Sequence, residues 1–122
     1  MSVRGIRGAI TIENDTPEEI QAATLALLNA IQESNPDLNP EDVASVFFTV
    51  MEDIRSGFPA TAVRLAGWNL VPLFCGTEIP VPDSLPLCIR ILIHWNTELA
   101  QKEINHVYLG QAISLRPDLE IQ

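Results

Sequence analysis

The amino-acid sequence predicts an α+β (mixed α/β) domain with a mixed sheet of about five strands and about two to three helices on one face of that sheet. Its 122 residues suit one domain with one hydrophobic core, so we expect residues 1–122 to form a single unit. Short apolar runs with strand-like alternation recur along the chain, and helix-start signals stand between them at Thr16 and near Pro59. Strands and helices mixed in this order are typical of the predicted fold class.

The first strand and the first helix have the clearest signals. Residues 3–12 ("VRGIRGAITI") alternate isoleucine with small or charged residues, as a strand does. Thr16 is the expected N-cap of the following helix, Pro17 its first residue, and Glu19 would close a capping box. The apolar stripe of this helix comprises Ile20, Ala23, Leu27, Leu28 and Ile31, with Thr24 as its polar member. We expect the helix to end near residues 33–37.

The remaining elements follow from turn residues and apolar patterns. In chain order they are a helical turn at 39–42, a strand at 43–50, a helix from Pro59 to near Gly67, a strand at 69–75, a loop at 76–86, a strand at 87–95, a turn or short helix at 98–105, a strand at 106–113 and a tail from about 114 to 122. Helices cover only one sheet face in this arrangement. Because the other face also has apolar residues, another subunit is its natural cover.

Composition limits the possible partners and location. A net charge of −9 argues against nucleic acid and against an anionic membrane surface. The two cysteines form neither a secreted disulfide framework nor a metal-binding spacing. The N-terminus has no uninterrupted apolar run typical of a signal peptide, and no apolar stretch is long enough to span a bilayer. We expect a cytoplasmic protein.

Arginine predominates among the basic residues. Six of the seven are arginine, and Lys102 is the one lysine. Arginine is suited to bidentate capture of carboxylate or phosphate groups, whereas lysine is the usual solvated surface charge. Base-composition drift, or ion pairing with the 16 acidic residues, is an alternative explanation for this bias.

Arg90 lies in the middle of the apolar strand at 87–95, where a charge is costly unless an anion meets it. For Arg90 alone, a buried ion pair with Glu78 or another acid is the favoured interpretation, and the same holds for Arg7 in the first strand. Two such strand arginines in one small domain favour a shared site for a small polyanion. His94 is interpreted as a satisfied core or interface residue rather than as a catalytic one.

Several enzyme classes lack their signatures in this chain. Neither histidine stands near a nucleophile motif, there is no phosphate-binding loop, and "RGIRG" opens a strand rather than the helix that a dinucleotide site requires. No cluster of metal ligands is visible. We therefore expect no metal site.

Six sequence blocks resemble the AroH-type monofunctional chorismate mutases, in the order and at the spacing of that family. They are "RGIRGAITIENDT" at 4–16, "FPATAVR" at 58–64, Cys75 with Glu78, "CIR" at 88–90, "HVYL" at 106–109 and "LRPDL" at 115–119. The resemblance implies a homotrimer with a pseudo-α/β-barrel core and active sites at the subunit interfaces. It implies conversion of chorismate to prephenate, toward phenylalanine and tyrosine, by a [3,3] rearrangement that needs no cofactor, metal, nucleophile or proton transfer.

The resemblance also implies roles for the residues nearest the reacting bonds. Arg90 matches the residue that donates to the ether oxygen of chorismate, and Arg7 and Tyr108 match those that hold the enolpyruvyl carboxylate. Glu78 matches the acid that hydrogen-bonds the ring hydroxyl, and Cys75 matches a second polar contact to this hydroxyl.

Other matching residues are expected at the border of the site. Phe58 and Arg64 match residues from the neighbouring subunit, and Leu115 and Arg116 match a mobile tail that covers the site. Thr61 stands where some relatives have lysine.

Phe74 likewise stands where some relatives have threonine, so side-pocket contacts are expected to differ while the reaction is retained.

Two other classes of protein fit parts of the pattern. An oligomeric amino-acid-sensing domain would use arginine to hold a carboxylate, but it does not require Glu78 beside an ether-directed Arg90. A trimeric imine-hydrolysing deaminase would also use a strand arginine, but the first and last of the six blocks do not belong to it.

Overall fold

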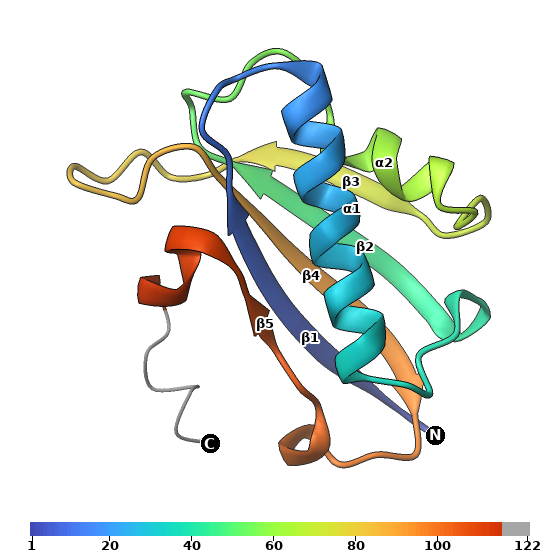
Figure 1. Cartoon of the computed structure of the whole chain (residues 1–122). Coiled ribbons are helices and arrows are strands. Elements are labelled where there is room, and N and C mark those ends of the chain that lie inside the picture. Colours follow the sequence, from blue (N-terminus) through green and yellow to red (C-terminus); the bar gives the residue numbers. More distant parts are fainter. Residues whose placement is uncertain (116–122) are drawn as a thin grey trace.

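The structure, a computed structural model that describes residues 1–115, is a five-stranded mixed sheet with both α-helices on one face, which confirms the predicted fold class (Figure 1). The strands are β1 (Ser2–Thr11), β2 (Val43–Val50), β3 (Leu73–Thr77), β4 (Cys88–Thr97) and β5 (Val107–Tyr108). The helices are α1 (Pro17–Ser34) and α2 (Pro59–Leu65), with 3-10 helices η1 (Pro40–Asp42), η2 (Gln101–Glu103) and η3 (Gly110–Leu115).

The strand order is β3-β2-β4-β1-β5, so the apolar strand that contains Arg90 is the central one. β4 pairs antiparallel with β1 and with β2, whereas the edge strands β5 and β3 pair parallel with β1 and β2. A central strand has both edges hydrogen-bonded, which holds its side chains in a defined position.

The main core lies between the sheet and the helices. Alternate residues of β4 (Ile89, Ile91, Ile93 and Trp95) are buried against α1 and α2, together with the predicted stripe of α1. Five residues of that stripe are buried and Ala23 is partly buried, which confirms the helical period read from the sequence. The hydroxyl of Thr24 donates to the Ile20 carbonyl at 2.7 Å, which satisfies the polar member of the stripe.

The start of α1 differs in one detail from the predicted capping box. Thr16 is the N-cap, and its hydroxyl accepts from the Glu19 N–H at 3.1 Å. The Glu19 carboxylate accepts instead from the N–H groups of Glu13 and Asn14, at 3.1 and 3.0 Å, and not from that of Thr16. The Thr16 N–H is already bonded to the Asn14 carbonyl, so the carboxylate fixes the connection between β1 and α1.

Two predicted strands have a bound that differs by more than two residues in the structure. The strand expected at 69–75 begins at Leu73, because residues 69–70 form a turn and pairing with β2 starts where Val46 donates to the Pro72 carbonyl. The strand expected at 106–113 ends at Tyr108. Gly110, with φ +60°, turns the chain into η3, which includes the first two residues of the predicted tail.

The second sheet face has no α-helix packed on it within residues 1–115 (Figure 1). The 3-10 helix η3 covers only the part of this face near Ala9 and Cys88. We call it the open face. The residues whose side chains point to it include Phe47, Phe74, Leu92 and His94. Phe47 contacts the rings of Phe74 and His94, with centroid distances of 5.9 and 5.5 Å. His94 is hydrogen-bonded to the Ser45 hydroxyl at 2.9 Å, in agreement with the satisfied role expected for it. None of the described helices could cross a bilayer.

The segment before β5 is tied to the end of α1 by two asparagines. Asn35 is buried, with 4% of its surface exposed. Its amide donates to the carbonyls of Ile31 and Asn105 at 2.9 Å and accepts from the Asn105 N–H at 3.0 Å. These bonds place the chain that leads into β5 beside the sheet.

We expect Asn35→Ala to lower the free energy of unfolding by about 1–3 kcal/mol, because the Asn105 backbone groups lose their partner. Urea denaturation at a fixed protein concentration measures the loss. The matched control is Asn29→Ala, an exposed position of the same helix, where the gain in helix propensity should leave stability equal or slightly higher. Equal stability of the two variants would contradict this role of Asn35.

Candidate active site

Three strands meet around a small cavity that contains four of the residues expected in the site. Its volume is about 100 Å³. The expected residues in its lining are Arg7, Arg90, Tyr108 and Leu115, from β1, β4, β5 and η3. The remaining lining residues are Gly8, Ala9 and Ile91.

The strand register explains why these side chains meet. Ala9 of β1 is opposite Arg90 of β4 on one side and opposite Tyr108 of β5 on the other. Arg7 precedes Ala9 by two residues and therefore lies on the same face of β1. The small side chain of Ala9 leaves room for the long side chains beside it.

Arg90 has a weak acidic partner. Its Nη1 lies 3.7 Å from Glu78 Oε2, and the two side chains are 29% and 25% exposed. This separation exceeds the roughly 2.7–2.9 Å of a charge-assisted hydrogen bond. The ion pair considered for Arg90 from the sequence therefore exists, but it leaves the guanidinium donors largely available.

Thr49 is a residue of the site that the sequence did not single out. Its hydroxyl donates to Glu78 Oε2 at 2.7 Å, and it stands opposite Arg90 in the pairing of β2 with β4. Thr49 thus holds the Glu78 carboxylate beside the guanidinium. The available signal was its place among alternate residues of the strand at 43–50 that face away from the core.

Two buried donors in this cavity are unsatisfied. Among residues 1–115, neither Arg90 Nε nor the Tyr108 hydroxyl has a hydrogen-bond partner. Nearly all buried polar groups in folded proteins are hydrogen-bonded, so two exceptions in one cavity point to a ligand. With Arg7 beside them, the chemistry favours an anionic ligand with several oxygen acceptors.

A small second core supports the cavity. It consists of Ala9, Met51, Cys88 and Ala112, with Leu85, Tyr108 and Leu115 packed against it. Burial raises the pKa of the Cys88 thiol, and the nearby Arg90 offsets only part of this rise. Cys88 is therefore a neutral packing residue at physiological pH and not an activated nucleophile.

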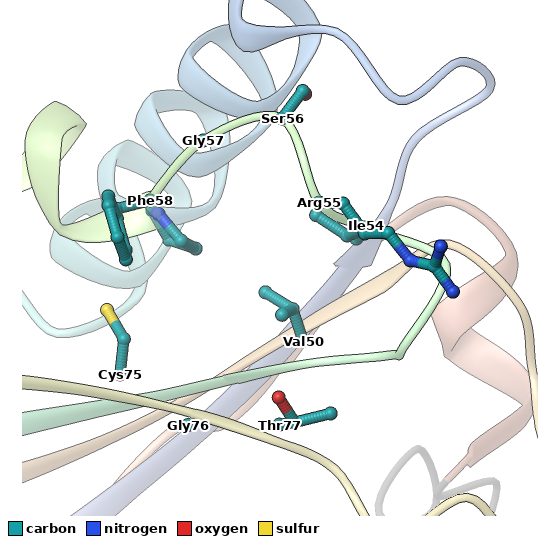
Figure 2. Close-up of a pocket in the computed structure, with 10 residues that line it drawn as sticks. Val50, Ile54, Arg55, Ser56, Gly57, Phe58, Cys75, Gly76 and Thr77 are labelled. Atoms are coloured by element: carbon teal, nitrogen blue, oxygen red, sulfur yellow. The ribbon is translucent and has the colours of Figure 1, made fainter.

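Two further expected residues line a different cavity, of about 300 Å³ (Figure 2). Phe58 lies on the loop before α2, and the Cys75 sulfur points toward it from β3. Cys75 pairs with the buried Phe48 and packs against the main core, so its side chain points away from the open face. Within one chain, Cys75 therefore lies in a different cavity from Arg90, the ion-pair partner of Glu78.

The remaining expected residues lie apart from both cavities or outside the described region. Arg64 and Thr61 are exposed on α2, and Phe74 is exposed on the open face. Arg116 lies outside the described residues. The single chain thus groups Arg7, Glu78, Arg90, Tyr108 and Leu115, and separates Phe58, Arg64 and Cys75 from them.

Comparison with known proteins identifies the family of the chain. The family model described as chorismate mutase type I matches residues 3–119. The chain belongs to this family. Two curated relatives named chorismate mutase AroH are 54% identical (Thermus thermophilus, 97% of each chain) and 45% identical (Bacillus subtilis strain 168, 99% of this chain and 95% of the relative).

A solved chorismate mutase from Clostridium thermocellum has the same fold. Its TM-score to this structure is 0.87 at 44% identity, covering 90% of this chain and 97% of that one. Membership of the chorismate mutase family leaves the sensor and deaminase alternatives without support.

The loop that carries Phe58 is attached to the start of α1 by one carboxylate. Asp15 accepts from the Ser56 hydroxyl at 2.7 Å and from the N–H groups of Arg55 and Ser56, at 3.0 and 3.2 Å. The hydroxyl bond is the main cause of a lowered pKa at Asp15. The charged form of Asp15 therefore favours the folded loop.

We expect Asp15→Asn to lower Tm near neutral pH, and the difference from wild type to shrink in acid. Because the folded pKa is depressed, this stabilisation is present above the unfolded pKa of about 3.9 and is lost as pH falls through the lower folded value. Calorimetry across this pH range measures it. The control is Asp37→Asn, an exposed aspartate without a hydrogen bond or ion pair among residues 1–115. A Tm difference independent of pH would contradict the expectation for Asp15.

Proposed function

We propose that this chorismate mutase converts chorismate to prephenate in the cavity of Arg7, Arg90 and Tyr108. The observation that carries the proposal is a pair of buried donors without a hydrogen-bond partner among residues 1–115, Arg90 Nε and the Tyr108 hydroxyl, next to a second arginine. The family match and the two relatives named chorismate mutase support the activity.

The reaction requires orientation and electrostatic stabilisation. Chorismate is a dicarboxylate with an enolpyruvyl ether and a ring hydroxyl, and it reacts only from a compact diaxial conformer. Holding this conformer supplies part of the rate enhancement. In the transition state the C–O bond breaks ahead of C–C bond formation, so negative charge develops on the ether oxygen. A fixed cation at that oxygen binds the transition state more strongly than the ground state.

Arg90 is suited to this role by its place in the sheet. Hydrogen bonding on both edges of β4 fixes its backbone, and the partly buried guanidinium acts in a less polar medium than water. Glu78 is close enough to orient the guanidinium, and its long 3.7 Å separation does not use up the donors. Glu78 then has a second role, as hydrogen-bond acceptor for the ring hydroxyl.

Arg7 and Tyr108 are assigned to the enolpyruvyl carboxylate. Tyr108 of β5 is opposite Ala9 of β1, and Arg7 precedes Ala9 by two residues on β1, so both side chains reach the cavity. A guanidinium and a phenol hydroxyl together offer donors of fixed direction to a carboxylate. Leu115, on η3 and within the predicted tail, lines the same cavity.

We propose further that three copies of the chain complete each site as a pseudo-α/β-barrel trimer. A cavity of about 100 Å³ is too small for chorismate, since ligand pockets usually measure about 300–1,000 Å³. The open face has exposed aromatic residues, with Phe47 40% and Phe74 66% exposed. A neighbouring copy would bring its Phe58 and Arg64 to the cavity, which these residues cannot reach in their own chain.

We expect Arg90→Lys to reduce kcat by about 10²–10³, the usual effect of losing one preorganised donor to developing charge. Lysine keeps the charge but lacks the planar fork. Loss of chorismate absorbance in the ultraviolet measures the rate. The matched control is Arg4→Lys on the same sheet, where arginine bonds the Leu99 carbonyl outside the cavity and wild-type rates are expected. A wild-type protein without activity would refute the proposed function, whereas an active Arg90→Lys would refute only the role of Arg90.

The trimer is tested by complementation between two inactive variants. Arg90→Ala and Arg64→Ala remove groups that we assign to opposite sides of one interface site. Co-refolded mixtures should recover part of the wild-type activity that neither parent has, because some interfaces then combine two intact halves. Sedimentation should give the mass of three chains. A monomeric active enzyme, or a mixture without recovery, would contradict the shared site.

A further inference from the structure

We infer that His106, as a neutral imidazole, is a positioning residue that sets the spacing between Arg7 and Tyr108. The inference rests on the carboxylate-binding role proposed above for these two residues. It assigns a function to a side chain that the proposed mechanism does not otherwise use.

The pairing of β5 with β1 is very short. Only Gly8 with Val107 and Ala9 with Tyr108 are in register, and the Leu109 N–H donates to the Ala9 carbonyl at 2.9 Å. Continuing the same parallel register by two residues would pair the Arg7 N–H with the Asn105 carbonyl.

That backbone acceptor is already committed to another bond. The Asn105 carbonyl accepts from the amide of Asn35 at 2.9 Å. The Arg7 N–H donates instead to His106 Nδ1, also at 2.9 Å. The imidazole of His106, which immediately precedes β5, therefore accepts the next hydrogen bond between the two strands. The donor of this bond is Arg7, whose guanidinium enters the cavity.

This hydrogen bond defines the protonation state of the imidazole. A backbone N–H can only donate, so Nδ1 must be the unprotonated nitrogen and any ring proton is on Nε2. The imidazolium would place two N–H groups against each other. Neutral His106 therefore acts as a substitute for a backbone carbonyl.

The same edge of β1 has a second side-chain contact, farther from the cavity. The Gln101 amide donates to the Gly5 carbonyl at 2.7 Å and accepts from the Gly5 N–H at 3.0 Å. His106 is the contact nearest the site, one residue before Val107 and two before Tyr108. Movement of β5 relative to Arg7 would misplace both carboxylate donors, and a displacement of about 1 Å can cost roughly 10²-fold in rate.

The test compares two amides of equal polarity. In His106→Asn the amide oxygen can occupy the place of Nδ1, whereas in His106→Gln the longer side chain moves it toward the place of Nε2. We expect His106→Asn to keep kcat/KM for chorismate within about 3-fold of wild type, and His106→Gln to lose about 10-fold or more, mainly through a higher KM. Equal kcat/KM values for the two folded variants would overturn the inference.

Two further measurements separate positioning from general stabilisation. Gln101→Leu removes the other edge contact and should lower stability while leaving KM unchanged; a KM increase equal to that of His106→Gln would overturn the specific role of His106. In a Tyr108→Phe background, His106→Gln should cost less than in wild type, because the two changes then affect the same interaction. Fully additive losses would contradict it. Absence of wild-type activity would instead refute the proposed function.

Discussion

The incomplete neutralisation of Arg90 is the interaction on which the site depends. A buried guanidinium without any acid would strongly destabilise the sheet, and one in a tight bidentate ion pair would have few donors left for a substrate. The structure lies between these limits, because Thr49 holds the Glu78 carboxylate at 3.7 Å from Arg90 Nη1. This separation reduces the cost of the buried charge, while Arg90 Nε has no hydrogen-bond partner in the described part of the chain.

The sheet holds this charge and the neighbouring donors in fixed positions. Strands support functional groups more exactly than loops, and β1 at the middle of the site is bonded to β4 along ten residue pairs. The main core packs α1 and α2 on one face, so the opposite face is available both for the cavity and for a neighbouring copy. Because the chain has a net charge of −9, its long-range field repels an anionic substrate, and binding depends on this local group of donors.

Much of the fold was predictable from local signals. The predicted apolar stripe of α1 and its predicted N-cap, Thr16, were confirmed, because a 3.6-residue period and a capping hydroxyl are local properties of the sequence. The strand at 106–113 was wrong beyond Tyr108, since an apolar run does not reveal the left-handed turn at Gly110. Resemblance to a family identified Arg7, Arg90 and Tyr108, which share one cavity, whereas no role was predicted for Thr49 or His106.

The sequence by itself determined most of the helices and strands, the acidic charge, the excess of arginine and the family. It also identified Arg90 as a charge in an apolar strand that needs an anionic partner. Tertiary structure alone decided how far that need is met, which carboxylate meets it, and which side chain bonds the Arg7 N–H from 99 residues away. The physical reason is that such contacts depend on strand order and register. The apolar alternation of a strand decides which of its side chains face the core. It does not specify which strands pair, and these contacts join strands that are far apart in the sequence.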